Sequence, residues 1–138
     1  MSFNPAALAA ASILVLGVTT LVPTVAQAEV FELRTYTTNE GKLDNLNARF
    51  RDHTTRLFNK HGIDNLGYWT PFDEPESGNT LIYLIHHANR QQADANWKSF
   101  GSDPQWQKVA RESQIGGKFL AQPPERLYLK ALDFSPLK

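Results

Sequence analysis

The chain has 138 residues and no cysteine, and its 14 Lys and Arg residues balance its 14 Asp and Glu residues. A chain without net charge lacks the basic face that attracts nucleic acids and anionic membranes, so neither is expected as a partner. The lack of cysteine excludes disulfides and thiol chemistry, and a small domain without such cross-links gains buried surface by forming a homodimer.

The N-terminal segment predicts export. Residues 6–22 are apolar and uncharged, and they are followed by a proline and the small-x-small triplet 26–28. This order is typical of a secretory signal peptide over residues 1–28, cleaved after its last residue. The alternative is an uncleaved membrane anchor, because about 17 apolar residues approach the length of a membrane span and the start MSFNP lacks Lys and Arg. We therefore expect a periplasmic or secreted protein with one domain over residues 29–138, free of the membrane after cleavage.

The first half of this domain predicts a strand and then a helix. Residues 30–37 alternate between polar and apolar side chains and are rich in β-forming types. A helix is expected to follow and to end near residue 60, where Gly62 suits a left-handed cap. Its apolar positions fall on one arc when placed at about 100° per residue: Leu43, Leu46, Phe50, Leu57 and Phe58.

The second half predicts two strands and a broken helix. Residues 63–72 and 80–88 have the composition of strands and enclose a polar turn. Asn89 is a candidate cap for the helix that follows, and Gly101 is expected to end it. Asp103-Pro104 then restarts a helix with a cap and a proline at its first position.

With a last strand predicted over residues 126–132, the order of elements is β-α-β-β-α-β. This is the ferredoxin-like arrangement, an α+β fold in which the helices cover one face of a four-stranded antiparallel sheet. Alternation assigns one set of side chains to the helix-covered face: Phe31, Leu33, Leu127, Leu129 and Ala131. It assigns the other set to the bare face: Glu32, Arg34, Tyr36, Arg126, Tyr128 and Lys130. A bare face with several tyrosines is typical of a surface that a partner covers.

Several stretches of the chain resemble the NIPSNAP domain. In chain order they are FELRTYTTNEGKL, RFRDHTTRLFNKHG, LGYWTP, TLIYL, NWKSFGSDPQW and LKALDFSPLK. The resemblance extends over residues 30–138. Its most specific pieces are Glu32-Leu33-Arg34-x-Tyr36 and Asp103-Pro104-x-Trp106, and the separation between them also fits.

The resemblance implies an architecture and only a broad function. The family belongs to the dimeric α+β barrel group, in which the sheets of two subunits close face to face with the helices outside. Glu32, Arg34 and Tyr36 are then expected to face the interior shared by the two subunits. Eukaryotic members are mitochondrial and are associated with vesicle trafficking and mitophagy, whereas bacterial members mostly lack an assigned activity. The exported start of this chain departs from that pattern, so a mitochondrial or cytosolic role transfers poorly.

The first strand carries the main candidates for ligand binding. Glu32 and Arg34 lie two residues apart on one strand face, close enough to pair. Either this pair is structural, or Arg34 uses its planar donor fork to hold an anionic or carbonyl group of a ligand. Other hydroxyls and rings can add contacts to such a ligand, although aromatic packing explains them equally well. The predicted ligand-binding residues are Glu32, Arg34, Tyr36, Trp69, Tyr83 and Tyr128.

The histidines give one candidate catalytic residue and no metal site. His53 lies at the edge of the apolar arc, where it is either a buried structural histidine or a proton shuttle for a pocket between helix and sheet. His86 and His87 are strand neighbours that point to opposite faces, and His53 and His61 are separated by about 12 Å of helical rise. Neither pair can share a metal ion, and His61 is explained by helix capping. No nucleotide or metal motif is present, so no cofactor is expected.

These observations leave different classes of function open. The first is a non-catalytic binding module, a homodimer that takes a small organic ligand or presents a surface to a protein. The second is a cofactor-independent oxygenase or isomerase acting on a small aromatic or carbonyl substrate, with His53 as base and Arg34 and Tyr36 as orienting groups. Asn65 and Trp69, expected on one strand face, fit the cofactor-free monooxygenases of the barrel group. The third is a purely structural or stress-associated dimer.

Overall fold

Residues 27–138 are described by the computed structural model of the protein. The predicted signal peptide lies almost entirely outside these residues, so export and cleavage stay predictions. Within residues 27–138, no helix combines the length and the apolar character that crossing a membrane requires.

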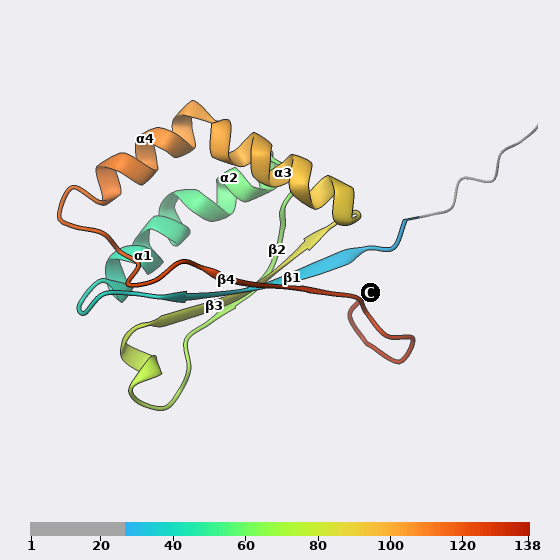
Figure 1. Ribbon diagram of the computed structural model, residues 1–138, viewed down its shortest axis with the longest axis horizontal. Helices are drawn as coiled ribbons and strands as arrows, with labels where there is room; N and C mark the ends of the chain where they lie inside the picture. The colour runs from blue at the N-terminus through green and yellow to red at the C-terminus, as the bar shows by residue number, and fades with distance from the viewer. Residues whose placement is uncertain (1–26) are drawn as a thin grey trace, which may run out of the picture.

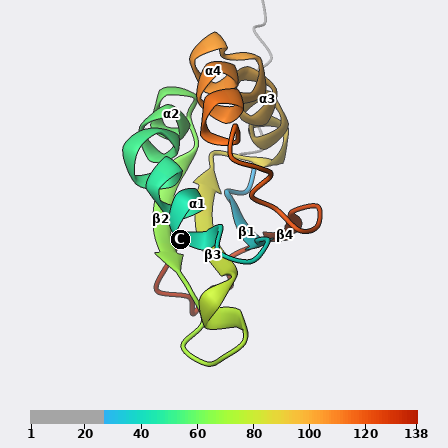
Figure 2. The same ribbon diagram turned by 90° about the vertical axis from the view of Figure 1, so that its left-hand side faces the viewer.

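The sheet is four-stranded and antiparallel, and the helices lie on one side of it (Figure 1). Its strand order, β2-β3-β1-β4, confirms the ferredoxin-like α+β fold. Seen from the side, α1 with α2 and α3 with α4 form two helical stretches that lie next to each other over the sheet (Figure 2). The elements are β1 (Val30–Thr37), α1 (Leu43–Arg49), η1 (Phe50–Thr54), α2 (Thr55–Lys60), β2 (Asp64–Trp69), η2 (Glu76–Gly78), β3 (Thr80–His87), α3 (Arg90–Ser102), α4 (Pro104–Ser113) and β4 (Glu125–Leu129).

The first helical stretch contains a π-helical turn, η1, between α1 and α2. Two threonine hydroxyls follow its wider spacing: Thr54 donates to the carbonyl of Arg49 at 3.3 Å, and Thr55 donates to the carbonyl of Phe50 at 3.2 Å. The predicted apolar arc is confirmed, because all of its members are buried: Leu43, Leu46, Phe50, Leu57 and Phe58. The last residue of α1, Arg49, is buried along with them.

Both helix caps predicted for the second helical stretch are confirmed. Asn89 accepts a hydrogen bond from the backbone N–H of Gln92, and Asp103 accepts one from that of Gln105, each at 2.7 Å. The predicted stop at Gly101 is wrong, because α3 runs through it. The break comes at Asp103, whose extended backbone (φ −66°, ψ 120°) is the conformation that a following proline favours.

Asp103 also ties the two helical stretches together. Its Oδ2 accepts hydrogen bonds from Lys60 Nζ at 2.7 Å and from His61 Nε2 at 2.6 Å. The other ring nitrogen of His61 lies 2.7 Å from the hydroxyl of Ser99. The hydrogen bonds from Lys60 and His61 hold the pKa of Asp103 well below its ordinary value. His61 therefore has a structural role at the end of α2.

Replacing Asp103 by asparagine is expected to cost stability at pH 7 and progressively less as the pH falls. Asparagine still caps α4, so the substitution removes mainly the charge. The folded-state pKa of Asp103 is below its ordinary value of 3.8, so its ionised form stabilises the fold above that pH, and acid removes the contribution. Urea denaturation between pH 7 and pH 2 measures the difference in unfolding free energy between wild type and variant, with Asp73→Asn at an exposed position as control. A gap that stays constant over this range would contradict the account.

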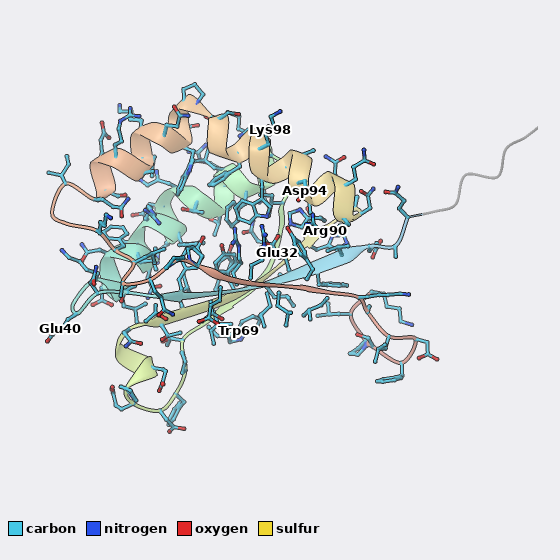
Figure 3. All side chains as sticks on the ribbon, viewed as in Figure 1. Glu32, Glu40, Trp69, Arg90, Asp94 and Lys98 are labelled. Atoms are coloured by element: carbon cyan, nitrogen blue, oxygen red, sulfur yellow. The ribbon has the colours of Figure 1, made fainter. Side chains whose placement is uncertain are left out.

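The predicted assignment of the two sheet faces is wrong. Glu32 is fully buried, hydrogen-bonded to Trp97 of α3 and on the helix side of the sheet in Figure 3. Arg34 and Tyr36 share its face of β1, so this polar row points toward the helices. Alternation shows which residues share a face, but it does not show which face the helices cover. Here α3 supplies polar partners, and the polar face of β1 is the covered one.

The bare face of the sheet is consequently apolar. The strand register places its central side chains together: Leu33, Ile82, Leu84, Leu127 and Leu129. Leu127 remains 56% exposed. The segment after β4 adds an apolar groove of about 430 Å³ on this side, lined by Phe31 and Leu84 of the sheet and by Phe134 and Leu137 of the segment.

A β-bulge in β2 separates two residues that were expected on one face. Asn65 pairs with Ile85, and Gly67 pairs with Leu84, so an extra residue lies between the two pairs. The bulge reverses the alternation. Asn65 therefore faces the helices, whereas Trp69 lies on the bare face, below the sheet in Figure 3. The Trp69 ring covers Gly67 so closely that a Cβ there would lie 2.3 Å from it.

Candidate functional site

The centre of the candidate site is the buried carboxylate of Glu32. Its Oε2 accepts hydrogen bonds from His87 Nε2 at 2.9 Å and from Trp97 Nε1 at 2.7 Å. The neighbouring strands β1 and β3 supply the acid and the histidine, and α3 places the indole over them. Three elements thus fix one carboxylate oxygen.

His87 holds Glu32 in place and has no free ring nitrogen. Its Nδ1 lies 3.2 Å from Asn96 Nδ2, which also donates to the carbonyl of Gly62 at 2.7 Å. An amide donor on Nδ1 leaves Nε2 as the protonated nitrogen, which matches its bond to Glu32. The prediction that His86 and His87 point to opposite faces is confirmed, since His86 pairs with Asp64 on the bare side. Among the described residues, no group of metal-ligating side chains is assembled.

Arg34 pairs with the second carboxylate oxygen. Its Nε lies 3.1 Å from Glu32 Oε1, which confirms the predicted pairing. Its guanidinium stacks on the Trp97 ring at 4.2 Å from the ring centroid. No described residue accepts a hydrogen bond from its terminal Nη atoms, and the side chain retains 12% exposure. Arg34 is therefore fixed at one edge and free to donate at the other.

Glu32 is a stable carboxylate in this setting. Burial alone would raise its pKa, but hydrogen bonds from His87 and Trp97 and the charge of Arg34 outweigh burial, and the pKa is lowered. An acid with a lowered pKa is a weak proton acceptor near neutral pH.

Some buried polar atoms at this site lack hydrogen-bond partners among the described residues. They are Glu32 Oε1, Arg34 Nε and the hydroxyl of Tyr128. The first two lie within ion-pair distance of each other but are not aligned for a hydrogen bond. Tyr128 lies directly across from Glu32 on the edge strand β4. Buried polar groups nearly always form hydrogen bonds, so several atoms without one in the same place call for an explanation.

Two arginines flank Tyr128 at the open edge of the site. The guanidinium carbons of Arg90 and Arg126 lie 3.9 Å and 5.2 Å from its ring centroid. Burial first, and then the charge of Glu32, raise the pKa of Tyr128, so its hydroxyl stays protonated and able to donate. Figure 3 shows Arg90 and Asp94 at the start of α3, close to Glu32.

Comparison with known proteins identifies the family. The model of the NIPSNAP family matches residues 31–136. The chain belongs to the NIPSNAP family. A NIPSNAP domain protein of Burkholderia xenovorans is 20% identical, with a TM-score of 0.65, and the match covers 78% of this chain and 98% of that one. A NIPSNAP family protein of Agrobacterium tumefaciens is 20% identical, with a TM-score of 0.68, and the match covers 81% and 93%.

A more distant neighbour of this NIPSNAP chain is an enzyme. A monooxygenase of Streptomyces coelicolor, solved with nanaomycin D, is 14% identical, with a TM-score of 0.54, and the match covers 76% of this chain and 88% of that one. At this identity the likeness shows the shared fold alone. A comparison with curated proteins found no match.

The NIPSNAP fold brings most of the predicted ligand-binding residues to one side of the sheet. Glu32, Arg34 and Tyr128 form the site, and Tyr83 donates from its buried hydroxyl to that of Tyr36 at 3.0 Å in the same layer. Burial raises the pKa of Tyr83 well above its ordinary value. Trp69 is not part of this group, because it lies on the bare face.

The candidate catalytic residue His53 is placed elsewhere. It is exposed on the π-helical turn η1, and none of the hydrogen bonds among the described residues joins it to Glu32 or Arg34. His87 and Trp97 are site residues that were not predicted from the sequence. One available signal was the indole of Trp97, because an indole N–H on a buried helix face needs an acceptor.

Proposed function

We propose that this NIPSNAP-family protein is a non-catalytic binding module, a homodimer in which each subunit holds a small organic acid beside Arg34. The observation that carries the proposal is a set of polar groups without hydrogen-bond partners among the described residues: the terminal nitrogens of Arg34, the hydroxyl of Tyr128, and Glu32 Oε1, which forms an ion pair with Arg34 but no hydrogen bond. Leaving such atoms buried and unsatisfied is costly, and a ligand that pairs with them removes the cost.

The chemistry of the site favours a carboxylate or carbonyl group. The terminal nitrogens of Arg34 form a planar donor fork that matches a carboxylate. The Tyr128 hydroxyl offers another donor, and Glu32 Oε1 can accept from a hydroxyl on the same ligand. Arg90 and Arg126 at the edge add positive charge that attracts an anion.

Binding is favoured over catalysis because the site lacks a free base. Both nitrogens of His87 are engaged, and the lowered pKa of Glu32 makes it a poor proton acceptor. The second candidate is a cofactor-independent oxygenase or isomerase for a small aromatic or carbonyl substrate. The similarity in fold to the Streptomyces monooxygenase supports that candidate. In this chain Glu32 Oε1, rather than the exposed His53, would receive the proton.

The apolar bare face supports the homodimer. Its central residues carry no charge, and exposed apolar patches of this kind mark interaction surfaces. A second copy offers the same uncharged face, so the two faces can pack without burying an unpaired charge. Arg34 and its neighbours lie on the opposite, helix-covered side of the sheet.

Native mass spectrometry of gently purified protein tests the ligand. We expect the wild type and the control variant Arg111→Met, which changes an arginine at an exposed position, to retain a small acidic compound. We expect Arg34→Met to lose it. Removing hydrogen bonds to a charged group costs about 1.5–3 kcal/mol, which weakens binding roughly 10- to 100-fold. Equal retention by Arg34→Met and the wild type would overturn the proposal. Oxygen uptake when the extracted compound is returned to the protein would favour the enzyme.

A further inference from the structure

Arg49 is a buried positive charge with no ion-pair or hydrogen-bond partner among the described residues. Only 8% of the residue is exposed, and its Nε is buried without a hydrogen-bond acceptor. None of the salt bridges or side-chain hydrogen bonds in residues 27–138 involves its guanidinium. Arg34, in contrast, has the carboxylate of Glu32 within 3.1 Å.

Packing does not account for this charge. The guanidinium lies 5.2 Å from the ring centroid of Trp106 and 4.9 Å from that of Phe119, within range of cation–π attraction. Such contacts recover only part of the cost of removing a charge from water, and a buried charge normally needs an ion pair as well. Burial also lowers the pKa of Arg49, although a guanidinium keeps its proton.

Arg49 lines a groove between the first helical stretch and α4. The groove has a volume of about 380 Å³, within the range of small-molecule sites. Ala48, Val109 and Phe119 give it an apolar wall. Arg49 also immediately precedes the π-helical turn η1, and π turns inside helices occur frequently at functional sites.

The rim of the groove limits the charge of its ligand. Asp52 and Glu112 both line it and are exposed. Their carboxylates repel a second negative charge on a ligand whose first charge pairs with Arg49. His53, the predicted base, also lines this groove. A ligand with a single carboxylate on a flat apolar body therefore fits both the buried charge of Arg49 and the apolar wall of the groove.

We propose that this groove binds a small aromatic monocarboxylate, with its carboxylate paired to Arg49 and its ring against the half-buried Ala48 and Val109. This site is additional to the one at Arg34 and does not depend on it. Arg49 lies at the end of α1 and Arg34 lies on β1, so substituting one arginine at a time tests each site separately.

Benzoate is the probe for this groove, with uncharged benzamide and doubly charged phthalate for comparison. Binding is followed by the Arg Nε–H resonances in NMR, where the Arg49 signal is assigned by its loss in Arg49→Lys. We expect benzoate to shift the Arg49 signal, and benzamide and phthalate to bind at least about tenfold more weakly. Arg34→Met should keep this response.

Arg49→Met supplies the second test. The variant replaces a buried, unpaired charge by an apolar side chain, so we expect its melting temperature without ligand to equal or exceed that of the wild type. Its benzoate affinity should fall at least about tenfold, whereas the exposed neighbour Arg51→Met should bind as the wild type does. A clear loss of stability in Arg49→Met would show that the charge is structural and would overturn the proposal. An Arg49 signal in the wild type that does not respond to benzoate would overturn it as well.

Discussion

Replacing Glu32 by alanine is expected to destabilise the protein by about 3–5 kcal/mol, the cost of breaking a buried ion pair from one side. The substitution leaves the ring N–H groups of His87 and Trp97 without an acceptor, and it leaves Arg34 without a counter-charge. Urea denaturation at pH 7 gives the difference in unfolding free energy between wild type and variant.

The matched control for this prediction is Glu40→Ala, because Glu40 is exposed (Figure 3) and has no bond to the helices in the described residues. Its effect should stay within about 0.5 kcal/mol. Glu32→Gln should fall between the two, since the amide oxygen still accepts a hydrogen bond while the charge is lost. If Glu32→Ala is no more damaging than Glu40→Ala, the carboxylate is not the centre of the site.

Local signals in the sequence were enough to predict the helices and strands and their order along the chain. The alternation of residues 30–37, the apolar arc of the first helical stretch and the caps at Asn89 and Asp103 all depend on neighbours in the chain, and the structure confirms them. The pairing of Glu32 with Arg34 is likewise a consequence of strand geometry.

Long-range contacts determine the features that were not predicted from the sequence, namely which face of the sheet the helices cover and on which face Trp69 lies. The polar row of β1 faces the helices because Trp97 and His87, 65 and 55 positions away from Glu32, supply its hydrogen bonds. Trp69 lies apart from the other predicted ligand-binding residues, because one bulged residue in β2 places its side chain on the bare face of the sheet. Neither effect has a periodic signature in a single chain.

Arg49 and His53 illustrate the same limit within one helical stretch. The period of an ordinary α-helix places His53 near the apolar arc, but His53 lies within the π-helical turn η1, where that period does not hold. His53 is exposed and Arg49 is buried. The candidate functional residue of this helical stretch is therefore Arg49 rather than His53.

A charge placed on the bare face is expected to separate the proposed homodimer into monomers. Leu127→Glu is the variant of choice, because Leu127 is 56% exposed in the single chain, so the monomer tolerates the carboxylate. In a face-to-face dimer the same carboxylate is buried without a partner, which costs several kcal/mol and should weaken association at least about 100-fold.

Light scattering over a range of protein concentrations measures the effect, with Gln107→Glu on the exposed face of α4 as the matched control. A wild type that is monomeric throughout, or a Leu127→Glu variant that dimerises as the wild type does, would remove the bare face as the interface. Either result leaves the Arg34 site standing, since Glu32, Arg34 and Tyr128 lie on the other side of the sheet. A Leu127→Glu monomer that still retains the acidic compound would show that each subunit holds its ligand alone. A monomer that loses the compound would show that the dimer stabilises the site across the sheet.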